Sequence, residues 1–123
     1  MKILIVEDEE VLVKVLQEKF EKENFTVKIA QDGAAVMPLV KTFKPDLILL
    51  DIIMPKKDGL SVLQELKDDT EFASIPVIMT SNLGEDEKIK QALKLGAVDY
   101  LVKTQHPINE VVEKVKKHLL KAK

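Results

Sequence analysis

The chain has 123 residues, a length typical of one domain, and its 46% hydrophobic and 33% charged residues exclude a disordered chain. A formal net charge of −2, with lysine but no arginine, argues against direct binding to nucleic acid. The absence of cysteine excludes disulfides and thiolate chemistry, and two histidines are too few for a polyhistidine metal site.

Short apolar segments alternate with longer amphipathic ones from the N-terminus onward. Residues 3–6 form a continuous apolar run, which predicts a strand buried on both faces. Residues 11–20 place apolar side chains at helical spacing with charges between them, which predicts an amphipathic helix. Residues 26–30 then predict a second strand.

The same alternation continues through the middle of the chain. Residues 34–43 predict a helix that Pro38 should kink or shorten. Residues 47–50 form the most apolar strand, and leucines recurring every three residues over 60–66 mark a third helix. Residues 76–79 predict the fourth strand.

The last third of the chain repeats the pattern once more. Apolar residues over 89–93 predict a fourth helix, which Gly96 closes as a C-cap. Residues 98–102 predict a fifth strand, and Pro107 in the first turn opens a last helix over 108–120. Five strand–helix units in strict alternation predict an α/β fold with a single doubly wound, five-stranded parallel sheet and five helices. The strand order 2-1-3-4-5 is one of the two common arrangements of such a sheet.

Polar residues follow four of these strands where the strands end. In the order 2-1-3-4-5, strands one, three, four and five lie side by side, so their carboxyl ends meet in one crevice, where ligands bind in such sheets. The residues expected there are Glu7, Asp8, Asp51, Thr80, Ser81 and Lys103.

These residue types predict phosphoryl-transfer chemistry at a metal. Three neighbouring carboxylates repel one another unless a cation compensates them, and oxygen ligands without histidine or cysteine suit Mg²⁺. A lysine and a hydroxyl suit phosphoryl oxygens, and a remaining carboxylate can act as a nucleophile that forms an acyl phosphate.

The sequence resembles a response-regulator receiver domain, the CheY-like phosphoacceptor module of two-component signalling, which has a flavodoxin-like fold. The resemblance covers essentially the whole chain, residues 1–123, as one receiver domain. Each block alone is weak, but the five occur in the family's order. They are residues 5–9 (IVEDE), 46–55 (DLILLDIIMP), 58–59 (DG), 76–81 (PVIMTS) and 96–103 (GAVDYLVK).

The resemblance implies a role for each site residue. Asp51 would be the phosphoacceptor and would bind Mg²⁺ together with Asp8 and the backbone carbonyl of Ile53, while Glu7 would act through a metal-bound water. Lys103 would pair with the phosphoryl group. The switch residues would be Ser81, which lies 22 positions before Lys103 and is favoured over Thr80, and the aromatic Tyr100.

The sequence departs from the family pattern at several positions. Thr104 follows Lys103 where most members have proline after a cis peptide bond, so the bond here is either a strained cis bond or trans. Asn82 replaces a small residue and could narrow access to the acyl phosphate. Ile53 and Leu83 are apolar where the family's side chains flank the hydrolytic water, which predicts a slowly hydrolysed phosphate.

The implied partners are a histidine kinase or histidine phosphotransfer protein, an unknown downstream protein, and a second copy of the chain in a phosphorylation-dependent homodimer. Such a receiver catalyses only its own phosphorylation and slow dephosphorylation. Two alternatives stay open: a Mg²⁺-dependent phosphatase with an aspartyl nucleophile, which would need an acid where Ile53 stands, and a receiver cut from a larger regulator or hybrid kinase.

The sequence also carries expectations about surroundings. No apolar run approaches the 18 or more residues of a membrane span, and the apolar start is too short and too quickly acidic for a secretory signal. A cytoplasmic location without membrane contact is therefore expected. His106 and His118 are expected to face solvent, and the sequence indicates no partner for either.

Overall fold

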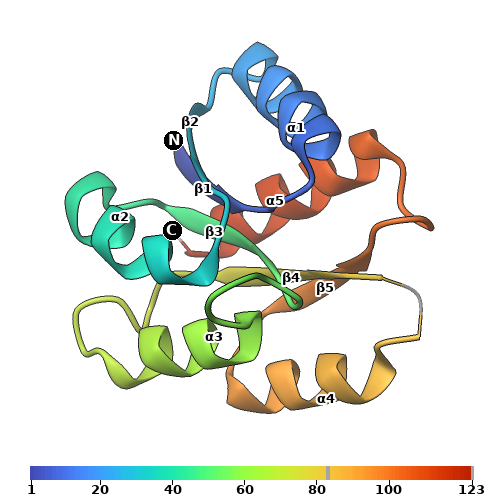
Figure 1. Cartoon of the computed structure of the whole chain (residues 1–123). Helices are drawn as coiled ribbons and strands as arrows, with labels where there is room; N and C mark the ends of the chain where they lie inside the picture. The colour runs from blue at the N-terminus through green and yellow to red at the C-terminus, as the bar shows by residue number, and fades with distance from the viewer. Residues whose placement is uncertain (83, 123) are drawn as a thin grey trace.

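Five parallel strands form one sheet at the centre of the molecule (Figure 1). The computed structural model describes residues 1–82 and 84–122, and within them the strand order is β2-β1-β3-β4-β5. This order and the all-parallel pairing confirm the predicted doubly wound sheet. The strands are β1 Lys2–Val6, β2 Thr26–Ala30, β3 Leu47–Asp51, β4 Val77–Ser81 and β5 Asp99–Val102.

Helices cover both faces of the sheet (Figure 1). The first and last helices pack on one face and the other three on the opposite face, as right-handed crossovers require. The helices are α1 Glu10–Lys22, α2 Val36–Phe43, α3 Gly59–Asp68, α4 Asp86–Leu95 and α5 Ile108–Ala122, with a short 3₁₀ turn, η1 Gly33–Ala35, before α2.

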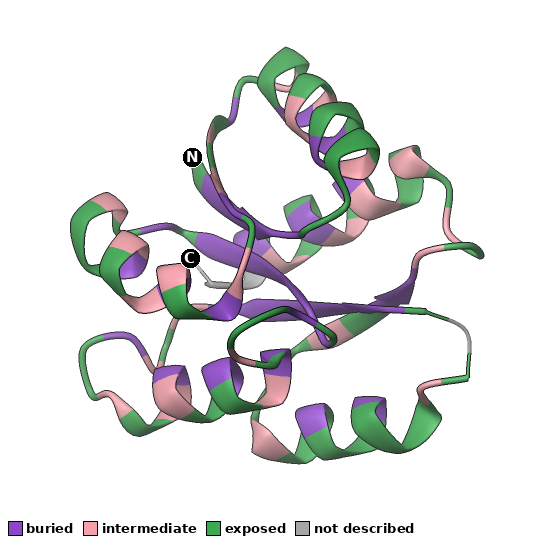
Figure 2. Ribbon diagram, viewed as in Figure 1, coloured by how far each residue is buried: buried purple, intermediate pink, exposed green. Residues whose placement is uncertain are grey.

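The two central strands β3 and β4 are buried along their whole length (Figure 2). Their side chains alternate between the two cores: Leu47 and Leu49 pack with α1 and α5, whereas Ile48 and Leu50 pack with α2, α3 and α4. Asp51 continues the series of Leu47 and Leu49. The alternation therefore directs the Asp51 carboxylate to the α1/α5 side of the sheet, at the carboxyl end of β3.

The second helix begins two residues later than predicted, and Pro38 lies in its first turn. Residues 33–35 form the 3₁₀ turn, with the Asp32 side chain accepting a hydrogen bond from the Ala35 N–H at 2.9 Å. The α-helix then begins at Val36, so Pro38 lies in the first turn, where a backbone N–H has no intrahelical partner.

The Asp58–Gly59 pair holds the start of α3 against the end of β3. Asp58 caps the helix by accepting a hydrogen bond from the Ser61 N–H at 2.9 Å. The Gly59 N–H donates to the Ile52 carbonyl at 2.7 Å. A Cβ atom at position 59 would lie only 2.1 Å from the Asp51 carbonyl oxygen, so only glycine permits this approach.

Candidate functional site

Three carboxylates meet where β1 and β3 end. Glu7, Asp8 and Asp51 each offer an oxygen atom, and these atoms lie within 4.8 Å of one another. Glu7 and Asp51 are each only 2% exposed, whereas Asp8 is exposed to solvent. The predicted acidic cluster is thus present, with two buried carboxylates and one accessible to solvent.

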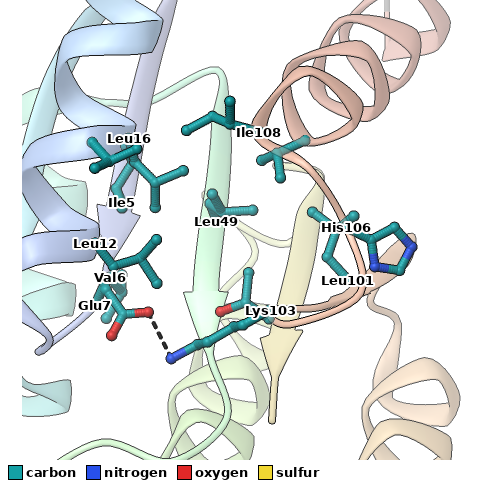
Figure 3. A pocket seen from close by; sticks show the side chains of 13 residues that line it. Ile5, Val6, Glu7, Leu12, Leu16, Leu49, Leu101, Lys103, His106 and Ile108 are labelled. Atoms are coloured by element: carbon teal, nitrogen blue, oxygen red, sulfur yellow. Dashed lines mark ion pairs between the residues drawn. The ribbon is translucent and has the colours of Figure 1, made fainter. Parts of the chain in front are cut away.

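Lys103 joins the two buried carboxylates from the far side of the crevice. Its Nζ lies 2.7 Å from Glu7 Oε1 and 2.8 Å from Asp51 Oδ2, and its side chain is 9% exposed. In Figure 3 the lysine side chain extends from the β5 side toward Glu7, along one edge of a cavity of about 130 Å³ between α1 and α5. The lysine ammonium group therefore offsets part of the negative charge of these two carboxylates.

Burial dominates the electrostatics of Asp51. Loss of hydration raises the pKa of its carboxyl from 3.8 to about 6; repulsion from Glu7 adds to the rise and the hydrogen bond from Lys103 opposes it. Burial alone would lower the pKa of Lys103, but its hydrogen bonds and ion pairs with Asp51 and Glu7 outweigh that effect and raise the pKa. Asp51 is therefore costly to ionise in this site, and a cation bound beside it would favour its charged form.

The donor set suits a hard divalent cation. The cluster contains carboxylates only, without histidine or cysteine, and one of its members faces solvent. Mg²⁺ prefers oxygen ligands and keeps several waters, so a partly open cluster of acids is suitable for it. The acidic group is therefore a candidate metal site.

The hydroxyl residues of β4 differ in their surroundings. Ser81 is fully buried, and its Oγ has no hydrogen-bond partner among the described residues. Its carbonyl accepts the Lys103 N–H at 2.8 Å, which ties it to the lysine. Thr80 is the register partner of Asp51 and borders the α1/α5 cavity. A buried hydroxyl without a hydrogen-bond partner is unusual and needs an explanation. Of these two residues, Ser81 is the one with such a hydroxyl.

Two further predicted residues lie at the margins of the site. The Ile53 N–H approaches Asp51 Oδ1 at 3.4 Å, and its side chain is 44% exposed. Tyr100 lies on β5, 38% exposed, with Lys114 Nζ 5.6 Å from the centre of its ring. Its ring is thus partly open to solvent. Leu83, expected to flank the hydrolytic water, lies outside the described residues.

Three side chains have contacts that the sequence analysis missed. Glu9 Oε1 lies 3.7 Å from Lys103 Nζ, so Glu9 adds a third acid near the lysine. The expectation of partnerless histidines is wrong: His118 Nε2 lies 2.9 Å from Asp99 Oδ2, and His106 Nδ1 lies 3.1 Å from the Val102 backbone.

The peptide bond between Lys103 and Thr104 is trans, which decides between the two forms that the sequence left open. The turn after β5 is therefore built without the cis-proline geometry expected of most receivers. Backbone hydrogen bonds from Gln105 and His106 to the Val102 carbonyl, at 3.0 and 3.2 Å, form it instead.

Comparison with known proteins identifies the fold and the family. The sequence model of the response regulator receiver domain matches residues 3–116, which include all the site residues described above. The chain belongs to the response regulator receiver domain family. The receiver fold and the predicted function class in two-component signalling are therefore confirmed, and the phosphatase alternative is not favoured. Receiver domains of this family partner with histidine kinases.

Relatives of this receiver domain occur in several contexts. The chain is 39% identical over 112 residues to the response regulator PleD of Caulobacter vibrioides, covering 90% of this chain but 24% of PleD. It is 35% identical to the chemotaxis protein CheY of Halobacterium salinarum, covering 82% of each. The receiver domain of a signal transduction histidine kinase from Syntrophus aciditrophicus superposes with a TM-score of 0.90 at 28% identity, covering 99% of this chain and 92% of that one.

The helices of residues 1–82 and 84–122 include none with both the length and the apolar character that crossing a membrane requires.

Proposed function

We propose that residues 1–123 form one receiver domain that accepts a phosphoryl group on Asp51 from a partner histidine and thereby changes an interaction surface. The observation that supports it best is the Asp51 carboxylate itself: buried, beside two further acids, and held by Lys103 at 2.8 Å, in a chain of the receiver family. Glu7 shares the burial and the contact with Lys103, at 2.7 Å, so the choice of Asp51 as acceptor rests on the match of its position to the family's phosphoacceptor.

The residues around Asp51 have separate tasks in this transfer. An Asp51 carboxylate oxygen attacks phosphorus, the bond from phosphorus to the donor's nitrogen or oxygen breaks, and an acyl phosphate forms. Lys103 then exchanges its contact with the carboxylate for one with a phosphoryl oxygen. The unpartnered Ser81 Oγ is available to donate to another phosphoryl oxygen. This new hydrogen bond would be the first step of the conformational switch.

Mg²⁺ is the cation that we infer for the acidic cluster. Asp8 and Asp51 would bind it directly with the Ile53 carbonyl, and Glu7 through a water. When bound, the ion offsets the negative charge that gathers on the phosphoryl oxygens. Glu7 stays paired with Lys103 at 2.7 Å and orients the lysine toward Asp51.

We propose that the surface formed by α4, β5 and α5 changes on phosphorylation and is recognised by the downstream partner. Tyr100 on β5 borders a hollow there with Leu93 and Ile89 of α4, and its partly exposed ring would turn inward with Ser81 on phosphorylation. An unidentified downstream protein, or a second copy of the chain, would recognise the change. The histidine-bearing partner, a kinase or a phosphotransfer protein, would meet the α1 side. The cytoplasmic location of the chain stays a prediction.

The test is the mass of the intact protein after incubation with acetyl phosphate and Mg²⁺. We expect the wild type to gain one phosphoryl group, and Asp51→Asn to gain none because the nucleophile is gone. Removing Mg²⁺ with a chelator, or changing Asp8 to Asn, should also prevent the gain. Asp58→Asn is the matched control, because asparagine still caps α3 and the acidic cluster is untouched.

Two results would contradict the proposal. Phosphorylation of Asp51→Asn to the wild-type level would place the acceptor elsewhere. A wild type that gains nothing from acetyl phosphate, and nothing from phosphorylated histidine kinases or phosphotransfer proteins, and that binds no Mg²⁺ in calorimetric titration, would leave an interaction module without phosphoryl chemistry.

Ile53 should slow the loss of the phosphoryl group. Its exposed apolar side chain stands beside Asp51 and offers no atom that could orient an attacking water. Ile53→Asn should therefore speed dephosphorylation about ten-fold, since an amide can hold that water in line. The decay of the phosphorylated mass after the donor is removed measures this. Ile53→Val is the control and should decay as the wild type does; an equal decay of Ile53→Asn would contradict the explanation.

A further inference from the structure

The strand that carries Lys103 lies at the edge of the sheet. β5 pairs with β4 alone in the order β2-β1-β3-β4-β5. The Lys103 N–H donates to the Ser81 carbonyl at 2.8 Å, on the β4 side. Backbone groups alternate in direction along a strand, so the N–H of Val102 points to the open edge. Such outward N–H groups need a partner or remain exposed to water.

His106 supplies that partner. Its Nδ1 lies 3.1 Å from the Val102 nitrogen and 3.1 Å from the Val102 oxygen. The Val102 carbonyl already accepts the N–H groups of Gln105 and His106, whereas the Val102 N–H points away from β4. The geometry therefore fits a hydrogen bond in which the Val102 N–H donates to Nδ1. Figure 3 shows the imidazole on the β5 side of the cavity.

This contact closes the turn that begins with Lys103. The turn runs from Val102 to His106. Its two ends are joined by two hydrogen bonds: the His106 N–H donates to the Val102 carbonyl, and the Val102 N–H lies against the His106 ring. The bond after Lys103 is trans, and residues 103–106 contain no proline to stiffen the turn. The His106 ring and the backbone bonds to Val102 thus constrain the turn that follows Lys103, in addition to the hydrogen bond from the Lys103 N–H to Ser81.

We infer that His106 is a positioning residue for phosphorylation: its Nδ1 holds the Val102 N–H, and through this turn it keeps the Lys103 amine on Asp51 and Glu7. The inference rests on the proposed function, because it concerns how Lys103 serves the transfer to Asp51. His106 itself touches neither the carboxylate nor the phosphoryl donor.

Three substitutions at one position test the inference. Asparagine places its Oδ1 where His106 has Nδ1, so His106→Asn should retain the contact, whereas His106→Gln mimics Nε2 and His106→Ala removes the acceptor. With acetyl phosphate and Mg²⁺ in excess, the phosphorylation rate should fall about five-fold in His106→Gln and His106→Ala, the effect of one lost hydrogen bond, and stay within about two-fold of wild type in His106→Asn.

Amide hydrogen exchange measured by NMR gives a readout that needs no phosphorylation. Exchange at Val102 and Lys103 should speed about five-fold in His106→Gln and His106→Ala and should not change in His106→Asn. Equal exchange at Lys103 in wild type and His106→Ala overturns the inference, whatever the phosphorylation result. So does faster exchange with an unchanged phosphorylation rate, or a His106→Asn protein that behaves like His106→Ala. A wild type that accepts no phosphoryl group counts against the proposed function, and therefore also against a role of His106 in phosphorylation. In that case the exchange pattern still tests the contact between His106 Nδ1 and the Val102 N–H.

Discussion

Asp51→Asn should raise the free energy of unfolding at about pH 8 by about 2–3 kcal/mol in metal-free buffer, while it removes the phosphoacceptor. Burial, helped by repulsion from Glu7, raises the pKa of Asp51 from 3.8 to about 6. Since one pKa unit corresponds to about 1.4 kcal/mol, ionising this carboxyl costs the folded protein about 3 kcal/mol. Asparagine has no charge to bury, and its Oδ1 can still accept the hydrogen bond from Lys103.

The pH dependence of this gain has a defined direction. Between pH 3.8 and about 6 the folded protein holds the Asp51 proton and the unfolded chain releases it. The wild type therefore loses stability as pH rises through this window, and the full cost is present above it. The advantage of Asp51→Asn should grow over the same window and vanish near about pH 4.

Urea unfolding followed by far-ultraviolet circular dichroism measures the difference at about pH 4 and about pH 8. The other carboxyl groups titrate in both proteins, so the difference between the two curves isolates Asp51. Asp58→Asn, which changes an exposed capping carboxylate, should match the wild type at both pH values. An Asp51→Asn protein no more stable than wild type at about pH 8, or a gap independent of pH, would contradict the electrostatic account.

The sheet and the charged centre of the site were predictable because both follow from periodicity. Apolar runs such as residues 47–50 identify strands, and the parallel order brings their carboxyl ends together. Glu7, Asp51 and Lys103 follow those strands directly, so their meeting follows from topology alone. Long-range placement of this kind needs no knowledge of side-chain conformation.

The contacts that could not be predicted depend on rotamers and loops. Glu9 lies between β1 and α1, and only its side-chain conformation brings it 3.7 Å from Lys103 Nζ. The sequence left the bond between Lys103 and Thr104 as either cis or trans. No proline follows the lysine, so the energetic cost of a cis bond was the only guide, and the structure shows a trans bond. His106 finds its partner across a turn whose shape depends on that bond. Each of these is decided by the folded neighbours of the residue.

Lys103→Met should lower the free energy of unfolding by about 3–5 kcal/mol at about pH 8 without metal, and slow phosphorylation by acetyl phosphate about 100-fold. The lysine is the cation that joins Glu7 and Asp51, which are both 2% exposed. Methionine fills similar space but leaves two buried carboxylates without a counter-charge. The phosphoryl oxygens also lose the ammonium group that would face them.

Three comparisons separate the lost charge from lost packing. Mg²⁺ should restore much of the stability of Lys103→Met, because it supplies positive charge to the same carboxylates. Adding Asp51→Asn to Lys103→Met should restore stability too, since only Glu7 then remains charged. Lys103→Arg keeps the charge and should lose less stability than Lys103→Met. Unfolding in urea, with and without Mg²⁺, measures all of them; a Lys103→Met defect that neither Mg²⁺ nor Asp51→Asn reduces would show that the lysine stabilises the fold by packing and not by its charge.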